Sequence, residues 1–383
     1  MALHFSQTEF ARRKADLCAS MAEQNLDGML LFSQESMFWL TGYDTFGFCF
    51  FQCLVIRADG EMALLTRSAD LRQAQHTSLL QDIHVWKDGQ DANPARDLLA
   101  LAARLKLLGK TLGVEFESHG LVAANGRKLD AAFAGQAALV DASHIITQLR
   151  AIKSPEEISY VRKAAVLSDA ADIAALSAIR AGADEGDILA AQQGAIFAGG
   201  GDYPANEFII GSGRDALLCR YKSGRRILDD QDQITLEFAG AYRHYHAAIM
   251  RTVPVGEPSR LHVEYHEAAR EALLACEAAM RPGKTAGDVF AAHARVLDET
   301  GLSQHRLHAC GYSLGAKFTP SWMDWPMFYE NNEWVLRHGM VMFVHIILMD
   351  SASGTAMCLG RTSLVTETMT ETLNLPSLDL VCR

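Results

Sequence analysis

The stretch from Leu236 to Thr252 reads LEFAGAYRHYHAAIMRT. Its pattern predicts a β-strand, a turn centred on Gly240 and a second strand, and therefore an antiparallel hairpin. Such a hairpin brings the carboxylate of Glu237 close to the imidazoles of His244 and His246. Three explanations are open at this point: a metal site, a metal site that has been emptied, and a hairpin with ordinary polar side chains.

Glu237 is the residue of this stretch that most needs an explanation. Ile234, Leu236 and Phe238 alternate toward one face of the predicted strand, which leaves Glu237 on the other face. Burying an unpaired carboxylate costs several kcal/mol, so Glu237 lies either at a strand edge in water or in a polar pocket with partners. The two histidines are weaker evidence, because imidazoles near a β-turn commonly face solvent or bind the backbone.

A third histidine, His345, lies in the almost wholly apolar run MVMFVHIIL from Met340 to Leu348. A single imidazole in such a strand is either hydrogen-bonded in the core or lines a cavity. Two glycine-rich segments, residues 199–204 and 210–215, lack the spacing that cradles a phosphate. We expect them to be loops that close over a ligand.

The first 150 residues alternate helical and strand patterns, which predicts an α/β domain. Helices are expected over residues 6–24 and 123–133. Strands are expected at residues 28–32, 48–56, 61–66, 113–116 and 138–141, with a turn at residues 58–60.

A second domain is predicted from residue 151 to 383. Ser154, Pro155 and Glu157 have the spacing of a helix N-cap, a first-turn proline and a capping box. Two long helices are expected up to residue 199, then a β region over residues 207–252, helices over 262–301, and strands at 340–348 and 358–366. Long helices around a largely antiparallel sheet indicate an α+β domain.

Composition narrows the class of protein. The 383 residues carry 35 Lys and Arg against 46 Asp and Glu, for a net charge of −11, and the basic residues are scattered. This distribution argues against nucleic-acid and membrane partners and favours a small-molecule partner. No segment reaches the length of a membrane span, and the eight cysteines form no CxxC pair, so we expect a cytoplasmic protein with reduced thiols.

The boundary segment 152–158 and the stretch 237–252 together resemble the creatinase/prolidase family, which is similar to peptidase family M24. The resemblance covers nearly the whole chain and implies the "pita-bread" fold for the second domain. In metal-dependent members, five ligands hold a two-metal centre. The corresponding positions here look like Glu237, Ala248, Tyr312, His345 and Gly360. Since Ala, Tyr and Gly remove the bridging carboxylates, the resemblance implies an emptied metal site and no cofactor.

Several segments are similar to the metal-independent branch that contains creatinase and ectoine hydrolase. They are residues 40–44 with Gln52 and Cys53, 200–205, 237–246, Arg251 with Thr252, Gly311 with Tyr312, and Trp322. The likeness implies hydrolysis of a C–N bond, of an amidine or amide, in a small zwitterionic compound. The sequence departs from the pattern of this branch at two positions. They are Arg220, where the wider family usually has a histidine, and His345.

The resemblance and the chemistry together suggest a role for each site residue. Glu237 is the expected nucleophile or base, and His246 or His345 the expected acid. Arg220 is expected to pair with a substrate carboxylate. Aromatic side chains are expected to wall the pocket. The remaining substrate-binding candidates are Tyr43, Asp202, Tyr203, Tyr242, Tyr312 and Trp322.

The family likeness also implies a homodimer in which a loop of one subunit, residues 41–46 here, reaches the partner's pocket. Two alternative functions stay open. One is a metal-dependent Xaa-Pro dipeptidase or aminopeptidase, and the other is a non-catalytic ligand-binding relative.

Overall fold

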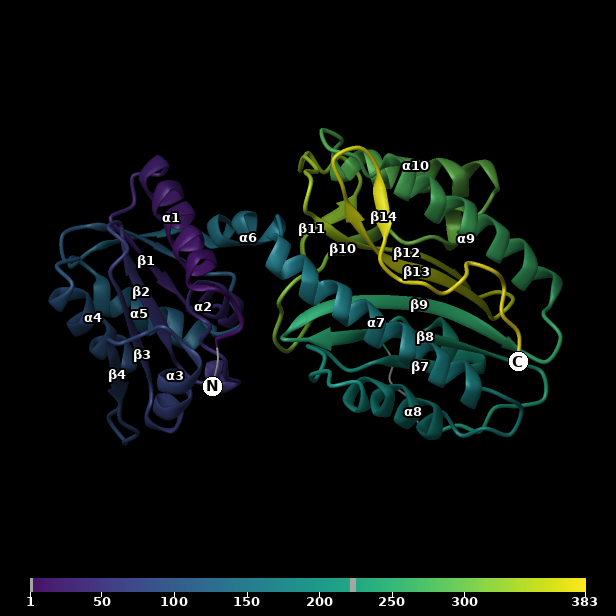
Figure 1. Cartoon of the computed structure of the whole chain (residues 1–383), viewed down its shortest axis with the longest axis horizontal. Coiled ribbons are helices and arrows are strands. Elements are labelled where there is room, and N and C mark those ends of the chain that lie inside the picture. Colours follow the sequence, from purple (N-terminus) through teal and green to yellow (C-terminus); the bar gives the residue numbers. More distant parts are fainter. Residues whose placement is uncertain (1–2, 221–224) are drawn as a thin grey trace. The chain divides into compact units, whose positions relative to one another are not determined.

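The computed structural model describes residues 3–220 and 225–383, and the chain forms two compact units, residues 1–150 and 151–383 (Figure 1). The first unit is α/β and the second is α+β, so the predicted fold class is confirmed. Over the described ranges, no helix is both long and apolar enough to cross a membrane.

Unit 1 is built on one six-stranded sheet with the strand order β4-β3-β2-β1-β5-β6. The pairs β1–β2 and β2–β3 are antiparallel, whereas β3–β4, β1–β5 and β5–β6 are parallel. The strands are β1 (Gly28–Leu31), β2 (Cys53–Arg57), β3 (Met62–Arg67), β4 (Ile83–Trp86), β5 (Thr111–Val114) and β6 (Ala138–Asp141).

Helices cover both faces of this sheet. Successive strand residues point to opposite sides, so the apolar strands contribute to one core on each face. Met29 and Leu31 face one apolar core with side chains of α1, α2, α3 and α6. Leu30 and Phe32 face a second core with α4 and α5. The helices are α1 (Gln7–Glu23), α2 (Gln34–Thr41), α3 (Leu71–Thr77), α4 (Pro94–Arg104), α5 (Ala123–Phe133) and α6 (Ser143–Ala151).

One predicted strand of unit 1 is shorter than expected. Residues 48–56 read as a strand, but Gly47–Cys49 form a 3₁₀ turn and β2 begins only at Cys53. Thr45 explains the turn, because its hydroxyl accepts the backbone N–H of Gly47 and donates to Asp70. Such local side-chain hydrogen bonds compete with strand pairing.

Glu115 joins the ends of two strands in unit 1. Its buried carboxylate accepts the backbone N–H groups of Phe32 (2.9 Å) and Ser33 (2.8 Å) and the hydroxyl of Ser36 (2.5 Å). Burial raises the pKa of Glu115 to about 7 despite these three donors. The carboxylate therefore fixes the passage from β1 into α2 against the end of β5.

We predict that Glu115→Ala lowers the free energy of unfolding by about 2–3 kcal/mol, because three donors lose their acceptor inside the protein. Glu115→Gln is the matched control, since its amide oxygen still accepts from Phe32 and Ser33. Denaturant unfolding of the two variants checks this. Equal stability of Glu115→Ala and wild type would show that water replaces the carboxylate.

Unit 2 contains an antiparallel sheet with the strand order β11-β10-β12-β13-β9-β8-β7, and β14 pairs with β13. The strands are β7 (Ile209–Ser212), β8 (Asp232–Tyr242), β9 (Tyr245–Val255), β10 (Ala309–Ser313), β11 (Asp324–Tyr329), β12 (Val341–Asp350), β13 (Thr355–Val365) and β14 (Thr370–Thr372).

Two pairs of helices pack on the same face of this sheet (Figure 1). Arg251 of β9 pairs with Asp172 of α7, and its neighbour Leu359 of β13 packs in the core formed with α9 and α10. The opposite face carries Glu237. The helices are α7 (Pro155–Ala178), α8 (Glu185–Ala198), α9 (Arg260–Ala279) and α10 (Ala286–Glu299), and the predicted capping box of Ser154 and Glu157 at α7 is confirmed.

The turn of the central hairpin was misplaced in the sequence prediction. It lies at Arg243 and His244, which both have positive φ (50° and 65°) and join β8 to β9. Gly240 lies inside β8 instead. A Cβ atom there would lie 2.2 Å from the carbonyl oxygen of Ala164 in α7, so this glycine allows the helix to approach the strand.

Candidate active site

A row of residues crosses four strands on the helix-free face of unit 2. The register pairs Glu237 of β8 with Met250 of β9, Met250 with Gly360 of β13, and Gly360 with His345 of β12. Directly paired residues of neighbouring strands share one face of a sheet. Glu237 and His345 therefore lie on the same face although 108 positions separate them in the chain.

Tyr312 connects Glu237 to a second aromatic residue. Its hydroxyl donates to Oε1 of Glu237 over 2.9 Å and accepts the indole N–H of Trp322 over 2.9 Å. All three side chains are buried, and Glu237 is 8 % exposed. Burial raises the pKa of Glu237 to about 7, while the Tyr312 hydrogen bond and the charge of Arg220 oppose this rise. The carboxyl group is therefore near its point of half-ionisation at neutral pH.

His345 belongs to a cluster of three rings. Its centroid lies 5.5 Å from that of Tyr312 and 5.4 Å from that of Phe343, and the latter two rings are 5.4 Å apart. Burial lowers the pKa of His345 to about 3, so the imidazole is neutral at pH 7. Its Nδ1 atom is buried without a hydrogen-bond partner among the described residues. A neutral ring with an unused polar atom is suited to hydrogen-bonding a ligand.

Arg220 borders this group of residues. Its charge lowers the pKa values of both Glu237 and His345. Its guanidinium Nη2 lies 3.7 Å from the sulfur of Met323, and the side chain is exposed. Arg220 also lines a cavity of about 190 Å³ together with Asn206, Glu207, Phe208, Ile209, Pro320 and Ser321.

The five positions that correspond to metal ligands do not fit a two-metal centre. The backbone N–H of Ala248 is bonded to the hydroxyl of Thr362. A Cβ atom at Gly360 would lie 2.8 Å from the carbonyl oxygen of Val344 and 3.0 Å from the ring of Phe343, so the ring occupies the space of a longer side chain. Across residues 3–220 and 225–383, no three His, Cys, Asp or Glu side chains are grouped to hold a metal ion.

His246 has a different role from the predicted acid. Its buried ring accepts the backbone N–H of Ala205 at Nε2 (2.9 Å), which leaves the proton on Nδ1, 3.3 Å from the carbonyl oxygen of Gly315. Burial lowers its pKa to about 3. Because both ring nitrogens bind backbone groups, His246 tethers two loops to the hairpin.

Two predicted pocket tyrosines lie elsewhere. Tyr242 is five residues from Glu237, and this odd spacing places it on the opposite face of β8. There its ring packs 5.8 Å from Tyr160, with the ammonium group of Lys163 4.8 Å from its centroid, and both residues belong to α7. Tyr43 is fully buried in the core of unit 1, and its hydroxyl donates to Gln52. In this structure both side chains therefore serve packing.

In the described part of the chain, neither Asp202 nor Tyr203 has a hydrogen bond or ring contact with Glu237, Tyr312, Trp322 or His345. Asp202 accepts the backbone N–H of His244 and so supports the hairpin turn. Tyr203 is 81 % exposed, and its ring centroid lies 4.8 Å from that of Phe197 of α8. The structure therefore gathers Glu237, His345, Tyr312 and Trp322, with Arg220 beside them.

Phe343 is the site residue that the sequence analysis missed. It lies two positions before His345 and therefore on the same face of β12. The two-residue period of a strand could have placed Phe343 beside His345. Phe343 drew no attention because it is one apolar residue in an apolar run.

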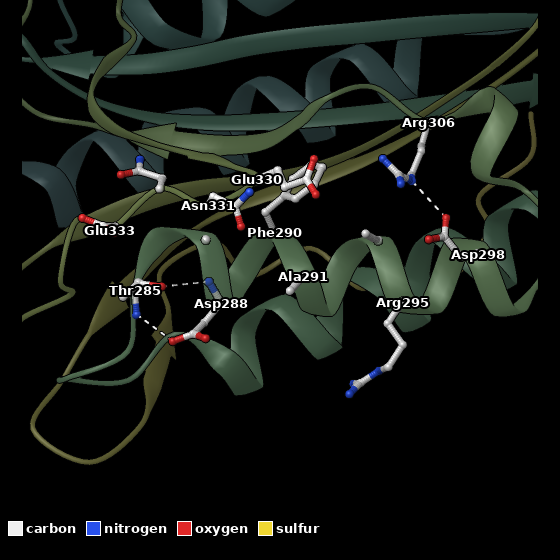
Figure 2. Close-up of a pocket in the computed structure, with 13 residues that line it drawn as sticks. Thr285, Asp288, Phe290, Ala291, Arg295, Asp298, Arg306, Glu330, Asn331 and Glu333 are labelled. Carbon is white, nitrogen blue, oxygen red and sulfur yellow. Dashed lines mark hydrogen bonds and ion pairs between the residues drawn. The ribbon is translucent and has the colours of Figure 1, made fainter.

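A larger cavity, of about 610 Å³, lies beside α10 on the helix-covered side of the sheet (Figure 2). Four of its polar residues already serve the fold. Asp288 accepts the backbone N–H of Thr285 at the start of α10, and Arg306 pairs with Asp298. We assign no function to this cavity.

Comparison with known proteins identifies both units. Residues 159–367 match metallopeptidase family M24, and residues 13–152 match the creatinase/prolidase N-terminal domain. The ectoine hydrolase of Halomonas elongata is 26% identical over 359 residues, which are 89% of each chain. The Xaa-Pro dipeptidase of Pyrococcus furiosus is 29% identical over 200 residues, 52% of this chain and 56% of the dipeptidase.

Among solved structures, the prolidase of Thermococcus sibiricus superposes with a TM-score of 0.89 at 19% identity and covers 99% of this chain and 100% of its own. At this identity the likeness concerns the fold alone. From its fold and from the matched length, the chain belongs to metallopeptidase family M24, and it carries a creatinase/prolidase N-terminal domain.

Proposed function

We propose that this protein hydrolyses a C–N bond, in an amidine or amide, of a small zwitterionic compound, and that it does so without a metal ion. The proposal rests chiefly on the buried carboxylate of Glu237, which accepts the Tyr312 hydroxyl and shares a sheet face with His345, whose Nδ1 has no partner among the described residues. Strongly shifted carboxyl groups cluster at functional sites, and hydrolysis is the activity of the similar ectoine hydrolase.

In the proposed reaction, Glu237 takes a proton from a water molecule while the water oxygen bonds to the amidine or amide carbon. The C–N bond then breaks, and the same proton passes to the leaving nitrogen. A carboxyl group with a pKa of about 7 is well matched to both transfers. Direct attack by the carboxylate on that carbon, followed by hydrolysis of the adduct, gives the same products.

His345 takes part as a neutral group in this proposal. With a pKa of about 3 it carries no proton to give as a cation at pH 7, but it hydrogen-bonds the substrate. This assignment replaces the expected role of a histidine as the acid. A neutral imidazole also leaves the pocket free of a second positive charge near Arg220, which we propose to pair with a substrate carboxylate.

Independence from metal follows in this proposal from the side chains at the former ligand positions. Glu237 and His345 remain as donors, while Ala248 and Gly360 offer none and Tyr312 is engaged with Glu237. Two donors are too few for the mononuclear or dinuclear centres that catalyse hydrolysis in proteins. This argues against the metal-dependent Xaa-Pro peptidase alternative.

We also propose a homodimer that works in the cytoplasm. Phe46, in the segment expected to reach a partner subunit, is 82 % exposed, which suits a contact surface. All eight cysteines are free thiols, as in proteins of reducing compartments.

A ligand screen tests the proposal as a whole. The purified protein is heated with ectoine, hydroxyectoine, creatine and related zwitterions, and each stabilising compound is then incubated and analysed for hydrolysis products. A ligand at one hundred times its Kd stabilises the folded state by about 2.7 kcal/mol. A stabilising compound that is never cleaved would favour the non-catalytic ligand-binding alternative.

We predict that the purified protein contains no stoichiometric transition metal and that chelators leave its turnover unchanged, because Ala248 and Gly360 cannot bind one. Elemental analysis before and after dialysis against chelator measures this. Two metal equivalents per subunit that leave together with activity, and restore it when added back, would contradict metal independence.

We predict that Glu237→Gln lowers turnover by at least about a hundredfold, because the amide is neither base nor nucleophile. The stability of the variant relative to wild type should also rise between about pH 4.5 and 7 and stay higher above that range, because over this range the carboxyl group of unfolded wild type releases its proton while that of the folded protein keeps it.

Glu157→Gln is the control for this variant, because Glu157 is also buried but lies on α7, on the other side of the sheet. Kinetics and thermal unfolding between pH 4 and 9 check both variants. Near wild-type turnover in Glu237→Gln would remove Glu237 from the reaction.

We predict that Arg220→Lys lowers kcat/KM by about tenfold or more, since lysine keeps the charge but cannot form a bidentate pair with a carboxylate. Arg214→Lys is the control, an exposed arginine of the 3₁₀ turn Gly213–Leu217 that precedes Arg220. Steady-state kinetics with a cleaved zwitterion measures both. Unchanged kinetics in Arg220→Lys would exclude Arg220 from substrate binding.

A further inference from the structure

The two carboxylate oxygens of Glu237 have different surroundings. Oε1 accepts the hydroxyl of Tyr312 over 2.9 Å. No hydrogen-bond donor pairs with Oε2 within residues 3–220 and 225–383. A carboxylate that is bonded at one oxygen has a defined orientation and one oxygen left for chemistry.

The orientation of the Tyr312 hydroxyl is itself fixed. The indole N–H of Trp322 has only a donor role, so the phenol oxygen must accept it (2.9 Å). The phenol proton is then directed to Glu237. The Trp322 backbone N–H is bonded in turn to the side-chain oxygen of Asn206 (3.0 Å), which holds the indole in place.

We propose that Tyr312 is a positioning residue for Glu237: held by Trp322, it binds Oε1, orients the carboxylate and leaves Oε2 as the atom that reacts. This inference deepens the proposed function and rests on it, because it assigns the reacting oxygen of the same carboxylate. It also gives Tyr312 and Trp322 a role other than the substrate binding that the sequence suggested.

Other titratable groups surround Glu237 and must be separated from Tyr312 in any test. The charge of Arg220 lowers the pKa of Glu237. The thiols of Cys219 and Cys358 lie close enough for Glu237 to raise their pKa values. His345 shares the face and stays neutral. Tyr312 is the group that donates a hydrogen bond directly to the carboxylate, so its removal should have a specific effect.

Tyr312→Phe removes the hydroxyl and keeps the ring. Loss of a donor to the charged form raises the pKa of Glu237. The acid limb of kcat/KM should therefore move to higher pH by about one unit or more. Trp322→Phe should move it in the same direction by less, because the phenol then loses the donor that directs its proton.

Tyr245→Phe is the matched control. Tyr245 is also fully buried, and its hydroxyl also donates to a glutamate, Oε1 of Glu157, over 2.7 Å, but on the α7 side of the sheet. This variant should lose stability while the acid limb stays at the wild-type pH. A shift of the same size in the control would mean that any lost buried hydrogen bond moves the profile, and would overturn the assignment.

A second measurement needs no substrate. The difference in unfolding free energy between each protein and its Glu237→Gln counterpart, followed against pH, reports the pKa of Glu237 in the folded state. For wild type this difference should change between about pH 4.5 and 7, and in the Tyr312→Phe background the change should continue to higher pH.

The two measurements distinguish the inference from the proposed function. An identical pH range in both backgrounds would overturn the role of Tyr312. A shifted range in a protein that cleaves no compound would uphold the coupling between Tyr312 and Glu237 and overturn the hydrolase proposal. A shift in both the kinetic and the stability profiles supports the two together.

Discussion

The close contact between helix α7 and strand β8 at Gly240 is the constraint on which unit 2 depends. Any Cβ atom there would meet the backbone of Ala164, so a glycine is needed for the helix to lie against the hairpin. Arg251 with Asp172 and Tyr245 with Glu157 fix the same helix to the same face. Once the helices occupy that face, strand alternation assigns Glu237, Ala248, Gly360 and His345 to the other.

This arrangement explains how a carboxylate is tolerated in so apolar a strand. Glu237 is buried, and within residues 3–220 and 225–383 no cation pairs with it at contact distance. The ionised form of its carboxyl group is stabilised by one hydrogen bond from Tyr312 and by the positive charge of Arg220. These two interactions do not fully offset the cost of burial, because the pKa of Glu237 is still raised. The buried carboxyl group of Glu237 can therefore gain or lose a proton near neutral pH.

The positions that the family resemblance relates to metal ligands are closely packed. Phe343 occupies the space that a side chain at Gly360 would need, and it packs with Tyr312 and His345. A ring cluster beside one carboxylate and a guanidinium is chemically unlike a pair of metal ions bridged by carboxylates. Within one family fold, the side chains at a few positions decide which chemistry a site can support.

The sequence by itself determined the architecture and singled out Glu237 as a candidate site residue. Alternating helix and strand patterns, the capping box at Ser154 and the apolar strands are local features, and local physics is readable along a chain. The tertiary structure alone decided which side chains meet. Glu237, Tyr312 and His345 come from three strands, and their contact depends on register, which no local pattern records. His246 was predicted to be catalytic because it is near Glu237 in sequence, but in the folded protein both of its ring nitrogens bind backbone groups. Tyr242 lies on the opposite face of the sheet because an odd number of residues separates it from Glu237 along the strand.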